Sequence, residues 1–342
     1  MCIHFKKSSF MLALIMIGSS SIAADIPGVQ IVPENAAFHE LIDSNARPEL
    51  ITDRALWVEG PVCNPKGLFI FSDVKQNRVM SWSENQGLKV WLAPSDDQNG
   101  HAVDDEGRII AASHGRRAVL RQEHDGTWVT LADSWEGKRL NSPNDVTVAP
   151  DGAIWFTDPT FGVLRKDESY GGKPEQDGEY VYRYEPSSRR LSRVNTPEVH
   201  SPNGLAFSPD GKTFYVSDTQ LAHDFGNNKL AHRILAYRVS GANLSGGRVF
   251  AEVSPGIPDG ITTDEKGNVW SSSKEGIQVF SEQGVLLGKI RVPLKNTGNL
   301  ALCKGTGSRK WLYVTAANLL MRLPVKVSEA GKGLSGTYTP GV

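Results

Sequence analysis

The sequence predicts an all-β fold, a six-bladed β-propeller with four-stranded blades around a central channel. The main reason is a unit that recurs at roughly 40- to 60-residue intervals: a polar residue, an apolar strand, a Gly eight residues after the polar residue, and a second apolar strand. The second reason is that no segment longer than a turn or two shows 3.6-residue periodicity. The polar residues and their glycines are Glu59 and Gly67, Asn99 and Gly107, Asn144 and Gly152, Asn203 and Gly211, Asp259 and Gly267, and Asn299 and Gly307.

Each copy continues into further short apolar runs, which complete four strands per blade. Residues 24 to about 50 carry little periodicity and are expected to form an N-terminal arm, which can supply a strand that closes the ring. The outer strands follow in order at 77–82, 88–92, 118–121, 128–131, 180–184, 191–194, 233–237, 276–280 and 319–323. Two long insertions, Thr160 to Glu179 and Gln220 to Ala231, are predicted to be either functional lids or solvated loops.

The chain ends and overall charge restrict the class of protein. The 342 residues carry a net charge of −1 without basic runs, which argues against a nucleic-acid partner. Lys6 and Lys7, the apolar run from Phe10 to Gly18 and the small residues before position 24 are typical of a signal peptide at 1–23. We therefore expect a single domain at 24–342 that is periplasmic or secreted, free of the membrane after cleavage, and a monomer or weak dimer; an uncleaved anchor is the alternative.

Two cysteines remain after the signal peptide. Cys63 lies in the first repeat and Cys303 in the last, which are neighbours in a closed ring, so they could pair in an oxidising compartment. Both lie in apolar strand runs, where free Cys is often a small buried hydrophobe. The sequence therefore favours two buried thiols.

The leading polar residues of the repeats are expected to meet at one mouth of the channel. Glu59, Asn144, Asn203 and Asp259 offer two carboxylates and two amide oxygens, without His or Cys. Such a set suits Ca²⁺, then Mg²⁺ or Mn²⁺, with Zn²⁺ at most in vitro. The alternative is that they are ordinary turn residues, but this does not explain their constant phase or the presence of Glu in the first copy. The sequence thus predicts a metal site.

Several motifs together resemble the gluconolactonase/regucalcin (senescence marker protein) family over roughly residues 50 to 325. The resemblance implies a six-bladed propeller with one divalent cation, usually Ca²⁺, at the channel mouth. It implies Glu59, Asn203 and Asp259 as direct ligands and Asn144 as a further ligand or substrate contact, with Asn99 and Asn299 lining the pocket. The motifs are Trp57-Val58-Glu59-Gly60-Pro61, Phe71-Ser72-Asp73, Arg139-Leu140-Asn141-Ser142-Pro143-Asn144-Asp145, Pro202-Asn203-Gly204-Leu205-Ala206-Phe207 and Pro258-Asp259-Gly260.

One position departs from the family pattern. Sugar lactonases of the regucalcin type carry an Arg two residues before the third-blade Asn, and here that position is Ser142. Arg116, Arg117 or Lys138 are the candidates to supply a compensating positive charge.

The resemblance implies an exported, metal-dependent hydrolase that opens a lactone ring, with Asp259 as the general base as well as a ligand. His101 and His114 are alternative bases; together with Asn99, Asn144 and Asn299 they are the expected substrate-binding residues. We keep two alternatives: a phosphotriesterase or esterase on the same metal site, and a non-catalytic binding propeller. Asp73, Asp158 and Asp218, which end the second strand of their repeats, are interpreted as hydrogen-bonding residues that join blades.

Overall fold

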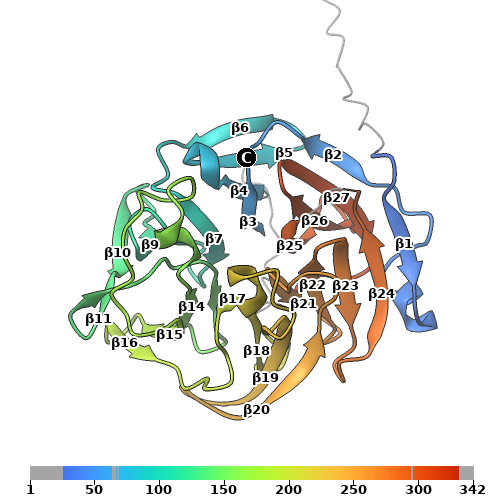
Figure 1. Ribbon diagram of the computed structural model, residues 1–342. Coiled ribbons are helices and arrows are strands. Elements are labelled where there is room, and N and C mark those ends of the chain that lie inside the picture. The colour runs from blue at the N-terminus through green and yellow to red at the C-terminus, as the bar shows by residue number, and fades with distance from the viewer. Residues whose placement is uncertain (1–25, 64–66, 68, 294–295, 331–342) are drawn as a thin grey trace, which may run out of the picture.

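The computed structural model describes residues 26–63, 67, 69–293 and 296–330. Six antiparallel sheets stand side by side in a closed ring around a common centre (Figure 1). This confirms the predicted six-bladed propeller. The predicted signal peptide lies outside the described residues. Within the described part of the chain, no helix is both long enough and apolar enough to cross a membrane.

Each blade contains four strands, numbered outward from the centre of the ring. Blade 1 is β3 (Val58–Cys63), β4 (Phe69–Asp73), β5 (Arg78–Ser83) and β6 (Gly87–Leu92); blade 2 is β7 (Gln98–Val103), β8 (Ile109–Ser113), β9 (Ala118–Gln122) and β10 (Trp128–Ala132); blade 3 is β13 (Val146–Val148), β14 (Ile154–Asp158), β15 (Tyr180–Glu185) and β16 (Arg190–Arg193). Blade 4 is β17 (Pro202–Phe207), β18 (Thr213–Asp218), β19 (Arg233–Ser240) and β20 (Asn243–Glu252); blade 5 is β21 (Ile261–Thr263), β22 (Val269–Ser273), β23 (Gly276–Phe280) and β24 (Leu286–Arg291); blade 6 begins with β25 (Thr297–Lys304), β26 (Lys310–Ala316) and β27 (Leu319–Val325).

The N-terminal arm supplies two outer strands. β2 (Glu49–Thr52) pairs with β27 and is the fourth strand of blade 6, so the two ends of the propeller share one sheet. β1 (Gln30–Pro33) adds a fifth strand to blade 5 by pairing with β24. The 3₁₀ helix η1 (Ala36–Glu40) lies between them, and its Phe38 is fully buried between blades 5 and 6.

The core is divided among the interfaces between neighbouring blades. Because side chains alternate along a strand, Phe69 and Phe71 of β4 pack toward blade 6 while Ile70 between them packs toward blade 2. The same alternation in β26 sends Trp311 to blade 1 and Leu312 to blade 5. Central strands are therefore buried on both faces, which explains their continuous apolar runs.

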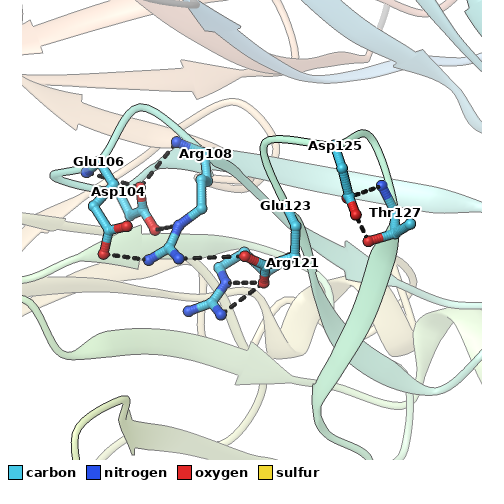
Figure 2. A network of polar contacts seen from close by, with 7 residues as sticks. All are labelled: Asp104, Glu106, Arg108, Arg121, Glu123, Asp125 and Thr127. Carbon is cyan, nitrogen blue, oxygen red and sulfur yellow. Dashed lines mark hydrogen bonds and ion pairs between the residues drawn. The ribbon is translucent and has the colours of Figure 1, made fainter.

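The recurring Gly belongs to the turn that follows each innermost strand. All six glycines have φ between +68° and +88°, a region that favours Gly. In blade 2 the Asp104 carboxylate accepts hydrogen bonds from the amides of Glu106 and Arg108, which fixes this turn around Gly107. Figure 2 shows how Arg108 then connects the turn to Glu123 of the neighbouring hairpin.

Cys63 and Cys303 form a disulfide, with a Cα–Cα distance of 5.9 Å. The prediction of two buried thiols was therefore wrong. The innermost strands β3 and β25 are neighbours in the closed ring, and this brings together two sulfur atoms that are 240 residues apart in the sequence. The apolar surroundings that suggested thiols are equally compatible with a buried disulfide.

Smaller elements lie in the loops, three of them within a blade and one between blades 2 and 3. They are the 3₁₀ helices η2 (Val74–Gln76) and η3 (Gln220–His223), the two-stranded ribbon β11 (Ser134–Trp135) with β12 (Lys138–Arg139), and the short helix α1 (Phe161–Leu164). Helix α1 begins the first long insertion and η3 begins the second.

Candidate active site and metal centre

The leading residues of the repeats lie where the backbones of neighbouring innermost strands contact one another. The amide of Gly100 donates to the carbonyl of Asn144 at 2.8 Å, and the amide of Gly204 donates to that of Asp259 at 3.0 Å. A side chain has no room here: a Cβ on Gly60 would lie 1.8 Å from the Asn99 carbonyl oxygen. The Gly after the leading residue thus permits backbone contact between blades, which keeps the leading residues at one level.

Three buried aspartates hold the backbone that precedes the leading residues. Asp73 accepts hydrogen bonds from the amides of Leu56 and Trp57, just before Glu59. Asp158 accepts from the amides of Asn141 and Ser142 before Asn144, and Asp218 from that of Ser201 before Asn203. These amides lie in the segments that connect one blade to the next, so the aspartates fix the connections between blades. Their effect is to orient the metal-site candidates.

Glu59 and Asp259 come from different blades and interact in the interior. Burial, and then the charges of Asp259 and Asp145, raise the pKa of Glu59 well above its usual range. Burial, and then the charges of Asp145 and Glu168, raise the pKa of Asp259 to about 7, although a hydrogen bond with Asn203 opposes this rise. The structure therefore brings Glu59, Asn203 and Asp259 together in the interior, and their role as metal ligands stays a prediction.

The donor set fits a hard divalent cation. Two buried carboxylates that destabilise each other's charge are stabilised by a cation between them, and the amide oxygens of Asn203 and Asn144 are ligands of the type that Ca²⁺ accepts. Among the described residues, no three His, Cys, Asp or Glu side chains are grouped so that they could hold a metal ion. A cation at this point thus depends on the amides as well as on Glu59 and Asp259.

Asn144 lies beside His114 and Asn99. The His114 Nε2 atom is 3.4 Å from Asn144 Nδ2 and 3.1 Å from Asn99 Nδ2, and His114 Nδ1 is 3.3 Å from the Glu168 carbonyl oxygen. Burial lowers the pKa of His114 to about 4, so the ring is neutral at pH 7. A neutral ring that donates through Nδ1 accepts both amide groups at Nε2, which leaves the Asn144 amide oxygen available as a ligand.

His101 and Asn299 face the channel interior. Both line a cavity of about 300 Å³ that also contains Asp145 and Glu329. His101 Nδ1 donates to the Gly60 carbonyl oxygen at 2.8 Å, and Asn299 Oδ1 accepts from the Leu300 amide. Burial lowers the pKa of His101 to about 4. Contact of these two residues with substrate stays a prediction.

The first insertion, residues 160–179, packs over the ends of blades 2 and 3. A Cβ on Gly162 would lie 2.5 Å from the His114 ring and 2.8 Å from the Ser142 Cβ, so the backbone of α1 rests directly on both residues. Glu168 is buried, and its charge raises the pKa of both Glu59 and Asp259. Sequence reasoning missed Glu168 because the insertion has no periodicity that would place it at the site.

Asp145 was also missed as a site residue. It is buried, and burial raises its pKa to about 7. Its position immediately after Asn144, at the start of an innermost strand, was the available signal.

The three cations proposed to compensate for Ser142 are engaged elsewhere or exposed. Arg116 pairs with Asp96 at 2.7 Å, and Arg117 donates to the Leu140 carbonyl oxygen at 2.7 Å. Lys138 is exposed on the ribbon strand β12. The cation whose charge acts on Asp259 is Arg165, in the first insertion.

The second insertion, residues 220–231, is tied to the first. The hydroxyls of Thr160 and Ser201 both donate to the Glu179 carboxylate, and His223 Nε2 lies 3.2 Å from Glu179 Oε1. The ring of His223 also stacks on Phe161 of α1, with centroids 4.6 Å apart. These contacts join the start of the second insertion to the first, whereas residues 223–229 of the second are exposed.

Comparisons with known proteins agree with this architecture. A family model described as "SMP-30/Gluconolactonase/LRE-like region" matches residues 57–318. A gluconolactonase of Zymomonas mobilis is 30% identical over 311 residues, which cover 84% of this chain and 83% of the relative. A pentonolactonase of Haloferax volcanii is 27% identical over 269 residues, or 76% of this chain and 81% of the relative.

Among solved structures, a gluconolactonase from Xanthomonas campestris is 36% identical, covers 89% of this chain and 97% of its own, and superposes with a TM-score of 0.80. A calcium-binding regucalcin from Agrobacterium tumefaciens is 21% identical, covers 81% and 94% of the two chains and has a TM-score of 0.62, which supports the fold alone. The chain therefore belongs to the SMP-30/gluconolactonase/LRE-like family.

Proposed function

We propose that this protein is a divalent-metal-dependent lactonase that hydrolyses the ring ester of a sugar lactone or a related lactone. The observation that carries the proposal is the meeting of Glu59 and Asp259, two buried carboxylates from different blades, with the amide of Asn203. The gluconolactonase and pentonolactonase among its relatives support a carbohydrate-derived substrate.

Glu59, Asn144, Asn203 and Asp259 are the residues that would hold the metal, with Ca²⁺ as the proposed ion. When bound, such a cation acts as a Lewis acid toward the lactone carbonyl oxygen. Glu59 is buried, and such low-polarity surroundings strengthen electrostatic interactions at the site. The hydrogen bond between Asn203 and Asp259 orients the Asp259 carboxylate.

Asp259 is the proposed general base. Its carboxylate accepts a proton from water as the water oxygen bonds to the lactone carbonyl carbon. The ring C–O bond then breaks, and the proton passes to the leaving alkoxide oxygen. The product is the open-chain hydroxy acid, so no further reactant is needed.

We also propose that the protein acts in the periplasm or outside the cell. The N-terminal pattern of Lys6, Lys7 and an apolar run supports export. The disulfide between Cys63 and Cys303 supports an oxidising compartment.

Removal of the metal tests the proposed function. Hydrolysis of D-glucono-1,5-lactone, followed by acid release with a pH indicator and corrected for the uncatalysed reaction, is expected to fall by roughly a hundredfold or more after treatment with EDTA. Addition of Ca²⁺ is expected to restore the rate, because the ligand residues remain in place.

Activity that survives EDTA would contradict the metal-dependent mechanism. Inactivity of folded, calcium-loaded protein on a panel of lactones would refute lactonase function. Hydrolysis of a phosphotriester or a simple ester in the same assay would then identify the alternative activity.

A further inference from the structure

The first insertion is fixed in place by small residues beneath it. Gly162 lies against His114 and Ser142, where no side chain fits. Ser142 is fully buried, and its hydroxyl donates to the Pro159 carbonyl oxygen at 2.6 Å. The carbonyl of Glu168 lies 3.3 Å from His114 Nδ1. The segment that follows α1 is therefore held against the site.

This segment carries an ion pair next to its contact with His114. Arg165 Nη1 lies 3.1 Å from Glu168 Oε1. The Arg165 side chain is 48% exposed, whereas that of Glu168 is 9% exposed. Glu168 is thus held in the interior, whereas Arg165 is exposed enough to contact a ligand.

The positive charge of Lys75, which lies beside the pair, is already neutralised by acidic side chains. Lys75 lies 2.9 Å from Asp167 and 3.7 Å from Glu168. Arg165 itself is partly neutralised by Glu168. Residues 160–179 carry three positive side chains against five negative ones, a net charge of −2, which disfavours recognition of an anionic group such as a phosphate.

The chemistry of the pair instead suits hydroxyl groups. A guanidinium has five N–H donors and no acceptor, whereas an ionised carboxylate only accepts. A sugar hydroxyl both donates and accepts, so adjacent hydroxyls can bond to Arg165 and Glu168 at once. Two neighbouring groups of opposite hydrogen-bonding character therefore match a neutral, polyhydroxylated ring.

We propose that Arg165, supported by Glu168, binds the hydroxyl groups of a neutral polyhydroxylated lactone and so determines substrate specificity. The proposal rests on the proposed lactonase function. It assigns to the insertion the positive group that the sequence suggested for Arg116, Arg117 or Lys138.

The test compares two lactones with the same six-membered ring. D-Glucono-1,5-lactone carries hydroxyl groups and δ-valerolactone carries none. The preference of the wild type for the hydroxylated lactone, as a ratio of kcat/KM values, is expected to fall roughly 10- to 100-fold in Arg165→Ala, because hydrogen bonds to a charged group are lost. The change is expected mainly in KM. Arg165→Lys keeps the charge without the planar fork and is expected to be intermediate.

Arg291→Ala is the matched control. The Arg291 side chain is 46% exposed and lies 3.6 Å from Glu275 on the outer part of blade 5, so its removal is expected to leave the preference unchanged. Equal losses on both lactones in Arg165→Ala, or no loss on the hydroxylated one, would overturn the assignment.

A binding measurement separates this proposal from the proposed function. Titration with D-glucono-1,5-lactam, a neutral hydroxylated analogue, reports on recognition without turnover. Roughly 10- to 100-fold weaker binding to Arg165→Ala is expected even if the wild type hydrolyses neither lactone. Equal binding to wild type and Arg165→Ala would refute the role of Arg165.

Discussion

Replacement of Asp259 by Asn is expected to lower kcat for lactone hydrolysis by roughly 10²- to 10⁴-fold, the usual contribution of a positioned general base. The amide has nearly the same shape as the carboxylate but cannot take a proton from water. It also removes one of the two negative charges that the proposed cation requires. Steady-state kinetics at saturating Ca²⁺ measures the change.

The fold is expected to survive this substitution. Burial and neighbouring carboxylates disfavour the charged form of Asp259, so a neutral amide leaves the thermal stability of the metal-free protein unchanged or higher. Asp53→Asn, which alters an exposed carboxylate between β2 and β3, is the control and should retain full activity. A kcat near that of the wild type in Asp259→Asn, or global unfolding, would contradict the catalytic role.

Removal of the disulfide by Cys63→Ala together with Cys303→Ala is expected to lower the free energy of unfolding by about 5 kcal/mol. The bond links residues 240 positions apart and joins the first blade to the last, so in the oxidised chain it strongly restricts the unfolded state. Guanidinium denaturation of both proteins, with and without a thiol reductant, measures the loss.

The reductant provides the internal control for this second prediction. It should lower the denaturation midpoint of the wild type toward that of the double variant and leave the variant unaffected. Coincident midpoints for the oxidised wild type and the variant would show that strand β2 closes the ring without help from the disulfide.

The fold could be predicted from the sequence because one local constraint recurs in every blade. The turn after each innermost strand needs a residue with positive φ. This requirement explains why a Gly stands eight positions after the leading residue, as in Glu59 and Gly67 or Asp259 and Gly267. The second recurring Gly, as in Gly60 and Gly204, marks the contact between neighbouring blades. Together the two glycines place the leading residue at the same position in every blade, which is why Glu59, Asn203 and Asp259 were predicted to meet.

The rest of the site depends on contacts that produce no repeating pattern in the sequence. Glu168 is held near the site because Gly162 and the Glu168 carbonyl both contact His114, and neither the length nor the composition of the insertion reveals these contacts. The roles of His114 and His101 follow from burial and hydrogen bonds, which a lone His in a sequence does not indicate. The disulfide was misjudged for a related reason, since strand context alone cannot distinguish a buried thiol from a buried pair.

The central claim is that one divalent cation is held by side chains from different blades. Calorimetric titration of metal-free protein with Ca²⁺ tests it most directly, with Glu59→Gln as the comparison. We expect one Ca²⁺ per chain in the wild type and an affinity lower by on the order of a hundredfold in Glu59→Gln, because ligand charge sets the strength of such sites. A wild-type protein that binds no divalent cation, or a Glu59→Gln protein that titrates like the wild type, would contradict the claim.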